Sequence, residues 1–270
     1  MPALRLALAQ VDTTVGDLAG NAAIVIDRTR EASAAGATLV AFPEMTLTGY
    51  PPEDLVLRRS FGQASRQALA RLAADLAGEG LGEIAVVVGY LDEHDGPRNA
   101  LAFVHSGQLI ARYFKHHLPN YGVFDERRYF VAGTELAIVR YAGVDIALTI
   151  CEDLWQDGGP FTVAGQCGVG LVVNINGSPY ERDKDDVRLP LLRRRAAEAR
   201  APVLYVNAVG GQDELVFDGD SMVVAADGTL RLRAPRYVPG VYCLDLHLPA
   251  APVQPPRPNS PEMTVARFGT

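Results

Sequence analysis

The sequence predicts a layered α/β sandwich that contains mixed β-sheets, and three observations lead to this fold class. The chain has 270 residues, of which 48% are hydrophobic and 21% charged, so it can bury a large core. Short β-rich runs alternate with longer helical stretches in the N-terminal third, and hairpins follow later. Parallel strands joined through helices, together with antiparallel hairpins, favour layered sheets over a closed barrel or a doubly wound sheet.

The N-terminal third repeats a strand–helix–strand pattern. Residues 4–10 alternate like a strand, and residues 21–35 are rich in helix-forming residues. Residues 38–42 then form a short apolar run that is typical of a buried strand. Residues 60–77 repeat Ala and Leu at helical spacing, and residues 83–91 are again apolar throughout. This region therefore predicts two helices between three strands.

The rest of the chain adds hairpins and another helix. Gly or Ser-Gly and Asp-Gly turns separate paired apolar runs, as in two-stranded hairpins. The predicted elements are hairpins over residues 99–114, 136–150 and 221–234, and strands over residues 170–176 and 202–209 that flank a helix over residues 186–200. Arg193, Arg194 and Arg195 lie in this helix at spacings that point them in different directions, so we expect them on a solvated or interdomain face.

The chain divides into one domain and a tail. Residues 1–248 carry all the periodic segments and form the predicted globular domain. Residues 249–270 contain six prolines and no apolar periodicity, so they are expected to be a tail or linker.

Composition excludes several classes of function. The formal net charge of -7 argues against binding nucleic acid or an anionic membrane, since both need a basic surface. No apolar run approaches the roughly 18 residues that span a bilayer, and the first residues lack the features of a signal peptide. The three cysteines, Cys151, Cys167 and Cys243, are too few and too unevenly spaced for a disulfide framework. A cytoplasmic protein that acts on small molecules or proteins is the expectation, with Cys167 and Cys243 as packing residues.

Three reactive side chains each follow a predicted strand, where α/β folds usually build their sites. Glu44 comes just after the strand that Pro43 breaks, Lys115 ends an apolar strand, and Cys151 follows another. Each has an ordinary alternative: a solvated or capping acid, a lysine that protects a sheet edge, and an inert buried thiol.

The three side chains have complementary chemistry. A nucleophilic thiol needs a base to accept its proton and a positive group or backbone N–H to hold an oxyanion. The adjacent His116 and His117 suggest a metal, but no further ligand accompanies them in a known metal-binding spacing, so we expect no metal site. Spacing along the chain does not establish that the three groups meet.

The segments around these residues resemble a known family. The order of Glu44, Lys115 and Cys151 resembles the Glu-Lys-Cys signature of the nitrilase, or carbon-nitrogen hydrolase, superfamily. The sequences of the segments are similar to the N-terminal glutaminase domains of glutamine-dependent NAD synthetases. The matching segments are FPEMTLTGYPPEDL, KHHLPNYGVFDERRYF, ICEDLWQDGG, NGSPYERDKDD and GGQDELVFDGDS. The resemblance covers residues 4–248 and implies a nitrilase-type four-layer α-β-β-α sandwich with two mixed sheets.

The resemblance implies a role for each matching residue. Cys151 would be the nucleophile, Glu44 the general base and Lys115 the cation beside the tetrahedral oxyanion; the charge of Lys115 is also expected to favour the thiolate. Glu126 matches a further carboxylate that orients Lys115 or the substrate. The residues that resemble the lining of a glutamine pocket are Tyr121, Glu152, Ser178 and Lys184.

The implied activity is a cysteine glutaminase that releases ammonia through a glutamyl thioester for an NAD synthetase domain or subunit, which converts deamido-NAD to NAD. The chain lacks the Ser-Gly-Gly-x-Asp-Ser pyrophosphate loop of the synthetase domain and any GxxxxGK[ST] motif, so we expect no cofactor here and assign ATP and Mg to the synthetase module. A homo-oligomer is expected. Two alternatives stay open: a free-standing amidase on another small amide, and a non-catalytic scaffold that docks to a synthetase.

Overall fold

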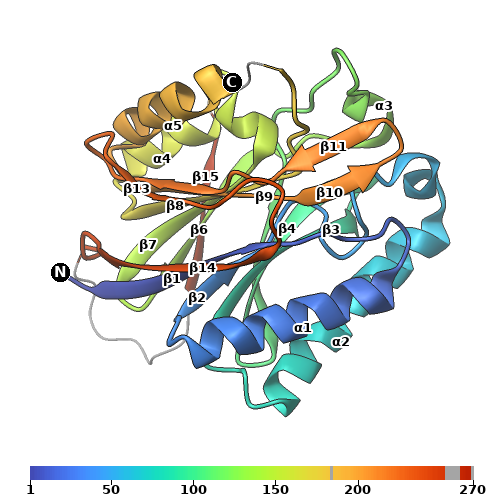
Figure 1. Ribbon diagram of the computed structural model, residues 1–270, viewed down its shortest axis with the longest axis horizontal. Coiled ribbons are helices and arrows are strands. Elements are labelled where there is room, and N and C mark those ends of the chain that lie inside the picture. The colour runs from blue at the N-terminus through green and yellow to red at the C-terminus, as the bar shows by residue number, and fades with distance from the viewer. Residues whose placement is uncertain (183–184, 253–261, 269–270) are drawn as a thin grey trace.

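Two β-sheets face each other in the computed structural model, and each is covered by helices on its outer side (Figure 1). The structure describes residues 1–182, 185–252 and 262–268. Helices α1 (Leu18–Ala34) and α2 (Arg59–Gly78) cover one sheet, and α4 (Pro160–Cys167) and α5 (Asp185–Ala199) cover the other. The predicted four-layer α-β-β-α sandwich with mixed sheets is confirmed.

The first sheet has the strand order β14-β1-β2-β3-β4-β5. Its central strands β1, β2 and β3 are parallel, whereas β14 pairs antiparallel with β1, and β4 and β5 continue antiparallel from β3. Helices α1 and α2 connect these strands. Because the strands are parallel, the carboxyl ends of β1, β2 and β3 lie at the same edge of the sheet. The strands are β1 (Ala3–Gln10), β2 (Leu39–Ala41), β3 (Ala85–Glu93), β4 (Pro97–His105), β5 (Gln108–Phe114) and β14 (Gly240–His247).

The second sheet has the order β13-β12-β9-β8-β7-β6-β15, and its central strands β7, β8 and β9 are parallel. The strands are β6 (Glu135–Tyr141), β7 (Val144–Ile150), β8 (Leu171–Asn176), β9 (Val203–Asn207), β12 (Met222–Val224), β13 (Leu230–Arg233) and β15 (Glu262–Arg267). The shorter elements are the 3₁₀ helices η1 (Glu53–Leu57) and η2 (Cys151–Leu154), helix α3 (Glu126–Tyr129), and the two-stranded sheet of β10 (Val209–Gln212) and β11 (Leu215–Asp218).

The alternation along β1 shows how the layers are held together. Leu6 and Leu8 belong to the core between the two sheets, and Ala7 and Ala9 pack toward α1 and α2. All four are fully buried. A buried Leu contributes about 1.5–3 kcal/mol relative to an exposed one, so the large side chains fill the space between the sheets and the small ones admit the helices. Period-two patterning therefore specifies both faces of the strand.

The predicted strands and helices are all present, with small shifts at their ends. Helix α1 begins at Leu18 rather than at residue 21, because the side chain of Asp17 accepts a hydrogen bond from Gly20 N at 2.9 Å and caps the helix. No helix among the described residues is both long and apolar enough to cross a membrane.

The prediction of a tail over residues 249–270 is wrong for one segment. Glu262–Arg267 form β15, which pairs antiparallel with β6 at the edge of the second sheet. Pairing with a distant strand supplies the backbone hydrogen bonds that the local proline-rich composition does not predict. Residues 253–261 and 269–270 of the predicted tail lie outside the described residues.

Candidate active site

The three predicted catalytic residues lie at the carboxyl ends of strands from both sheets. Glu44 follows β2 and Lys115 follows β5 in the first sheet, whereas Cys151 follows β7 and Gly177 follows β8 in the second. Hydrogen bonds and ion pairs link Glu44 to both Lys115 and Gly177. The face-to-face arrangement of the sheets therefore joins segments that are more than a hundred residues apart in sequence.

Lys115 lies between two carboxylates in the buried interior. Its Nζ is 2.8 Å from Glu44 Oε1 and 2.9 Å from Glu126. Lys115 is 1% exposed, Glu44 2% and Glu126 4%. Glu126 begins the short helix α3 and also accepts a hydrogen bond from Tyr50 Oη at 3.0 Å. One cation and two acids thus form a cluster that is almost completely buried.

The electrostatics of this cluster keep the lysine charged. Burial lowers the pKa of Lys115, but the charges of Glu126 and Glu44 outweigh it and hold the pKa well above its ordinary value. Burial raises the pKa of Glu126 to about 7, against the opposing effect of Lys115 and reinforced by Glu44. Lys115 is therefore a fixed positive charge, and Glu126 is the acid of the cluster that is poised to bind a proton near neutral pH.

Glu44 is held from both sides. Its Oε1 accepts hydrogen bonds from Lys115 Nζ and, at 2.6 Å, from Asn99 Nδ2, and its Oε2 accepts one from Gly177 N at 2.8 Å. A Cβ at Gly177 would come within 2.8 Å of the Tyr50 ring, so only glycine brings this backbone N–H so close. The carboxylate is fixed in one orientation.

Cys151 stands at the junction of β7 and η2 with a left-handed backbone, at φ 42°. It is 4% exposed. Burial raises the pKa of its thiol well above the ordinary value, the negative charge of Glu44 adds to this, and Lys115 acts in the opposite direction. The expectation that the charge of Lys115 favours the thiolate is therefore correct, but burial and the charge of Glu44 outweigh this effect. The resting thiol keeps its proton, so the site needs a base.

Asp153, which the sequence pattern did not single out, connects the segments that carry Lys115 and Cys151. Its Oδ1 accepts hydrogen bonds from the backbone N–H groups of His116 and His117 at 3.2 and 2.9 Å. Its Oδ2 accepts from Ile150 N at 3.0 Å and from Tyr113 Oη at 2.7 Å. This fully buried carboxylate fixes one strand end relative to the other. Its only sequence signal is its position two residues after Cys151.

The arginine run of α5 corrects another expectation. Arg195 is 1% exposed, and its Nε donates to Leu154 O at 2.6 Å, next to η2. It also pairs with Asp157 at 3.0 Å. The prediction of a solvated or interdomain face is therefore wrong for Arg195, which supports the loop that follows Cys151. Arg194 is exposed, as predicted.

Tyr121 and Glu152, two of the predicted pocket residues, are in contact. Tyr121 Oη donates to Glu152 Oε2 at 2.9 Å, and Gln156 Nε2 donates to Glu152 Oε1 at 2.6 Å. All three line a cavity of about 470 Å³, and Glu152 directly follows Cys151 in the chain. The tyrosine ring is 53% exposed, so it lies at the mouth of this cavity.

Of the other two predicted pocket residues, the structure describes only Ser178. Ser178 is buried, and its backbone N donates to Asn207 Oδ1 at 2.9 Å, directly after the Gly177 that binds Glu44. Lys184 lies outside the described residues. No group of three His, Cys, Asp or Glu residues in the described ranges is arranged to hold a metal ion.

The two remaining cysteines differ in exposure. Cys243 is partly buried and packs against the core between the first sheet and helices α1 and α2, as expected for a packing residue. Cys167 is exposed at the end of α4, so its predicted packing role is wrong.

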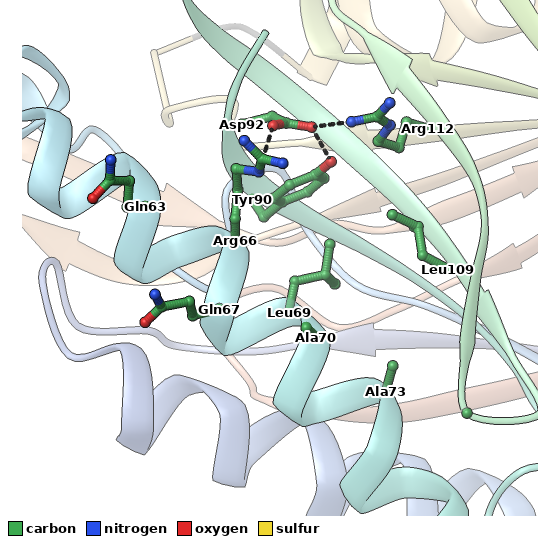
Figure 2. A pocket seen from close by; sticks show the side chains of 11 residues that line it. Gln63, Arg66, Gln67, Leu69, Ala70, Ala73, Tyr90, Asp92, Leu109 and Arg112 are labelled. Atoms are coloured by element: carbon green, nitrogen blue, oxygen red, sulfur yellow. Dashed lines mark hydrogen bonds and ion pairs between the residues drawn. The ribbon is translucent and has the colours of Figure 1, made fainter.

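A separate cavity of about 520 Å³ lies over the outer face of the first sheet, beside α2 (Figure 2). At its polar end, Asp92 accepts from Tyr90 Oη at 2.5 Å and pairs with Arg112 at 3.2 Å and Arg66 at 3.4 Å. These groups satisfy one another, and none of the predicted site residues lines this cavity. The candidate active site is therefore the buried cluster at the strand ends.

Comparisons with known proteins identify the family of the chain. Residues 5–251 match the family model described as carbon-nitrogen hydrolase. The glutamine-dependent NAD(+) synthetase of Thermotoga maritima is 43% identical over 229 residues, which are 84% of this chain and 39% of that relative. The one from Rhodobacter capsulatus is 41% identical over 92% of this chain and 44% of the relative. The chain thus spans about four-tenths of the length of these relatives.

Solved structures give the same result. A glutamine-dependent NAD+ synthetase from Acinetobacter baumannii superposes with a TM-score of 0.84 at 32% identity, over 94% of this chain and 48% of that chain. An amidase from Nesterenkonia sp. superposes with a TM-score of 0.79 at 27% identity, over 90% of both chains. A mutant of this amidase shows covalent addition of the acetamide moiety of fluoroacetamide at the active site cysteine.

Proposed function

The chain belongs to the carbon-nitrogen hydrolase family, and on this premise we propose that it is a cysteine-dependent glutaminase. It is an enzyme that hydrolyses an amide bond. One observation carries the proposed mechanism: Cys151 is buried at a strand end of one sheet, and the strand ends of the facing sheet hold the buried ion pair of Glu44 and Lys115, whose Oε1 and Nζ are 2.8 Å apart. These are the nucleophile, base and oxyanion cation that acyl transfer requires.

In the first step Cys151 Sγ attacks the side-chain carboxamide carbon of glutamine. Glu44 takes the thiol proton, and this transfer is necessary because the raised pKa of Cys151 keeps the thiol neutral at rest. The carbonyl oxygen becomes an oxyanion, which Lys115 and a backbone N–H near Glu152 stabilise. One such donor typically contributes about 3–4 kcal/mol to the transition state.

In the second step Glu44 gives the proton to the leaving nitrogen, the C–N bond breaks, and ammonia leaves behind a glutamyl thioester. Water then attacks the thioester while Glu44 takes its proton. The C–S bond breaks, glutamate forms, and the proton returns to Cys151. Glu126 acts here by holding Lys115 in place at 2.9 Å. Every proton and electron pair moves between substrate, water and side chains, so this hydrolysis needs no cofactor.

Glutamine is favoured by the groups around the cavity. The Glu152 carboxylate, held by Tyr121, offers an anionic partner for the α-ammonium group of a free amino acid. Ser178 and Lys184 are assigned to the proposed pocket on the family resemblance alone. Relatives that are about 40% identical are named glutamine-dependent NAD(+) synthetases, which supports the same choice.

The ammonia is proposed to pass to an NAD synthetase domain or subunit that uses ATP and Mg to convert deamido-NAD to NAD. The support is the similarity to relatives of which this chain matches about four-tenths. A homo-oligomer is part of the same proposal.

A free-standing amidase is the second candidate, and one observation favours it. The Nesterenkonia amidase aligns over 90% of both chains, so a chain of this size also occurs as a separate enzyme. Both candidates use Glu44, Lys115 and Cys151, and they differ in the cavity at Tyr121 and Glu152.

A substrate panel separates the candidates. Ammonia release is measured from glutamine, asparagine, acetamide and propionamide by the wild type, with Cys151→Ala as the inactive variant and Cys243→Ala as a matched thiol control. The proposal predicts that kcat/KM is highest for glutamine and is lost only in Cys151→Ala. A preference for acetamide or propionamide would establish the amidase instead, and no release from any amide would support the scaffold alternative.

A further inference from the structure

Asn99 on β4 makes an unassigned contact with the catalytic cluster. Its side chain is 1% exposed, and its Nδ2 donates to Glu44 Oε1 at 2.6 Å. The same nitrogen lies 3.5 Å from Glu126 Oε1, at the limit of a hydrogen bond. The amide group therefore bridges the two carboxylates that flank Lys115.

The contacts of Glu44 determine which of its oxygens is free to accept a proton. An ionised carboxylate has about four lone-pair sites, two on each oxygen. Oε1 accepts from both Lys115 Nζ and Asn99 Nδ2, so its two sites are occupied. Oε2 accepts from Gly177 N and keeps one site. Asn99 is the donor that completes the saturation of Oε1.

We propose that Asn99 is a positioning residue that saturates Glu44 Oε1 and leaves Oε2 as the atom that takes the proton from Cys151. The inference rests on the proposed hydrolysis. Oε2 then returns the proton to the leaving nitrogen, so one oxygen performs both transfers while the other stays bound to Lys115 and Asn99. In this role Asn99 acts through Glu44 and not on the substrate.

The orientation of the amide agrees with this role. With the carbonyl turned toward Glu44 and Glu126, three oxygens would face one another, so the NH₂ side must point to the carboxylates. The carbonyl Oδ1 is then buried without a hydrogen-bond partner among the described residues. An unpaired buried carbonyl destabilises the fold, and a leucine of similar size would avoid this. What the amide offers over a leucine is therefore the hydrogen bond that its NH₂ group donates to Glu44.

The titratable groups around Asn99 determine what its removal does. Asn99 contacts Glu44 and Glu126, and these two acids interact in turn with Lys115, Cys151 and Tyr50. A hydrogen bond to a carboxylate favours its ionised form, so loss of the Asn99 donor favours protonation of the acids in the cluster. The acid limb of the kcat/KM profile then moves to higher pH, by about one unit.

The test compares Asn99→Leu with a matched buried amide. Asn174 on β8 is equally buried, donates to Thr149 Oγ1 at 3.0 Å and also has an unpaired Oδ1, but it does not contact the cluster. Both leucine variants and Asn99→Ser are assayed for glutamine hydrolysis against pH. The pH dependence of Cys151 alkylation by iodoacetamide is measured in parallel, because it reports on proton removal without turnover.

Asn99→Leu is expected to lower kcat by about 10- to 100-fold, with KM within about threefold of the wild type. The pH profiles of hydrolysis and of alkylation should both shift to higher pH. Asn174→Leu is expected to keep the wild-type profiles. If Asn99→Leu does not fold, Asn99→Ser, which keeps a shorter donor, should show the same displacement to a smaller extent.

Profiles of the Asn99 variants that superpose on those of the wild type, or on those of Asn174→Leu, would overturn the inference. A wild-type protein that hydrolyses no amide would instead contradict the proposed function. The two failures are therefore distinguishable.

Discussion

Replacing Glu126 by Gln tests the electrostatics of the buried cluster through folding stability. Burial raises the pKa of this carboxyl to about 7 from the ordinary value of 4.5, although Lys115 Nζ is only 2.9 Å away. A carboxyl whose pKa is raised on folding binds its proton more tightly in the folded state. Its contribution to stability is therefore fully present below pH 4.5 and is lost as the pH rises toward 7.

The magnitude follows from the linkage relation. With a carboxyl pKa of about 4.5 in the unfolded chain and about 7 in the folded one, this group lowers the free energy of unfolding by roughly 2 to 3 kcal/mol between about pH 5 and about pH 8. Glu126→Gln keeps the shape of the side chain but has no proton to lose. The variant should therefore lack this part of the pH dependence.

The assay is urea unfolding of the wild type and Glu126→Gln at several pH values between about 5 and about 8. Glu198→Gln is the control, because Glu198 also forms an ion pair, with Arg195, but lies outside the cluster. The difference in unfolding free energy between Glu126→Gln and the wild type should change across this range, and that for Glu198→Gln should not. Parallel curves for Glu126→Gln and the wild type would refute the assignment of Glu126 as the acid that titrates near neutral pH.

Three further predictions concern the reaction. A glutamine-mimicking electrophile should add to Cys151 and spare Cys167 and Cys243, as read by peptide mass spectrometry; modification of either of the others in its place would remove Cys151 as nucleophile. Glu44→Ala and Lys115→Ala should each lower kcat by about a hundredfold or more, the usual result of losing a base or an oxyanion donor, and near-normal turnover would take that residue out of the mechanism. The chain alone should be a slow glutaminase, and an added synthetase module with ATP and nicotinate adenine dinucleotide should raise kcat/KM for glutamine by roughly five- to a hundredfold; a fast chain that a bound module does not change would favour the free-standing amidase.

The fold was largely predictable because its signals are local. Residues 4–10 and 83–91 show their strands through apolar patterning, and Gly36 marks the end of the first helix. Strand β15 was not predictable, because this segment forms a strand by pairing with β6, which is far away in the sequence. The composition of a segment does not reveal whether the segment pairs with the edge of a distant sheet.

The candidate site was predictable only in part, for a related reason. Glu44 and Lys115 stand out because each follows an apolar strand, but their 2.8 Å contact depends on the order of strands in the sheet. Asn99 and Asp153 look like ordinary residues of a hairpin and a turn. Their importance lies in the hydrogen bonds they make across the site, which no local pattern reveals. Arg195 was likewise misplaced, because a helix position does not show what packs against it.

The central claim is that Cys151 carries a glutamyl thioester during amide hydrolysis. The most direct measurement is acid quenching of the wild-type protein during steady turnover of glutamine, followed by mass spectrometry of its peptides. A glutamyl adduct is expected on the peptide that contains Cys151; it should disappear when glutamine is exhausted and be absent from Cys151→Ala. Ammonia release at the wild-type rate by Cys151→Ala, or an adduct on any other residue, would contradict it.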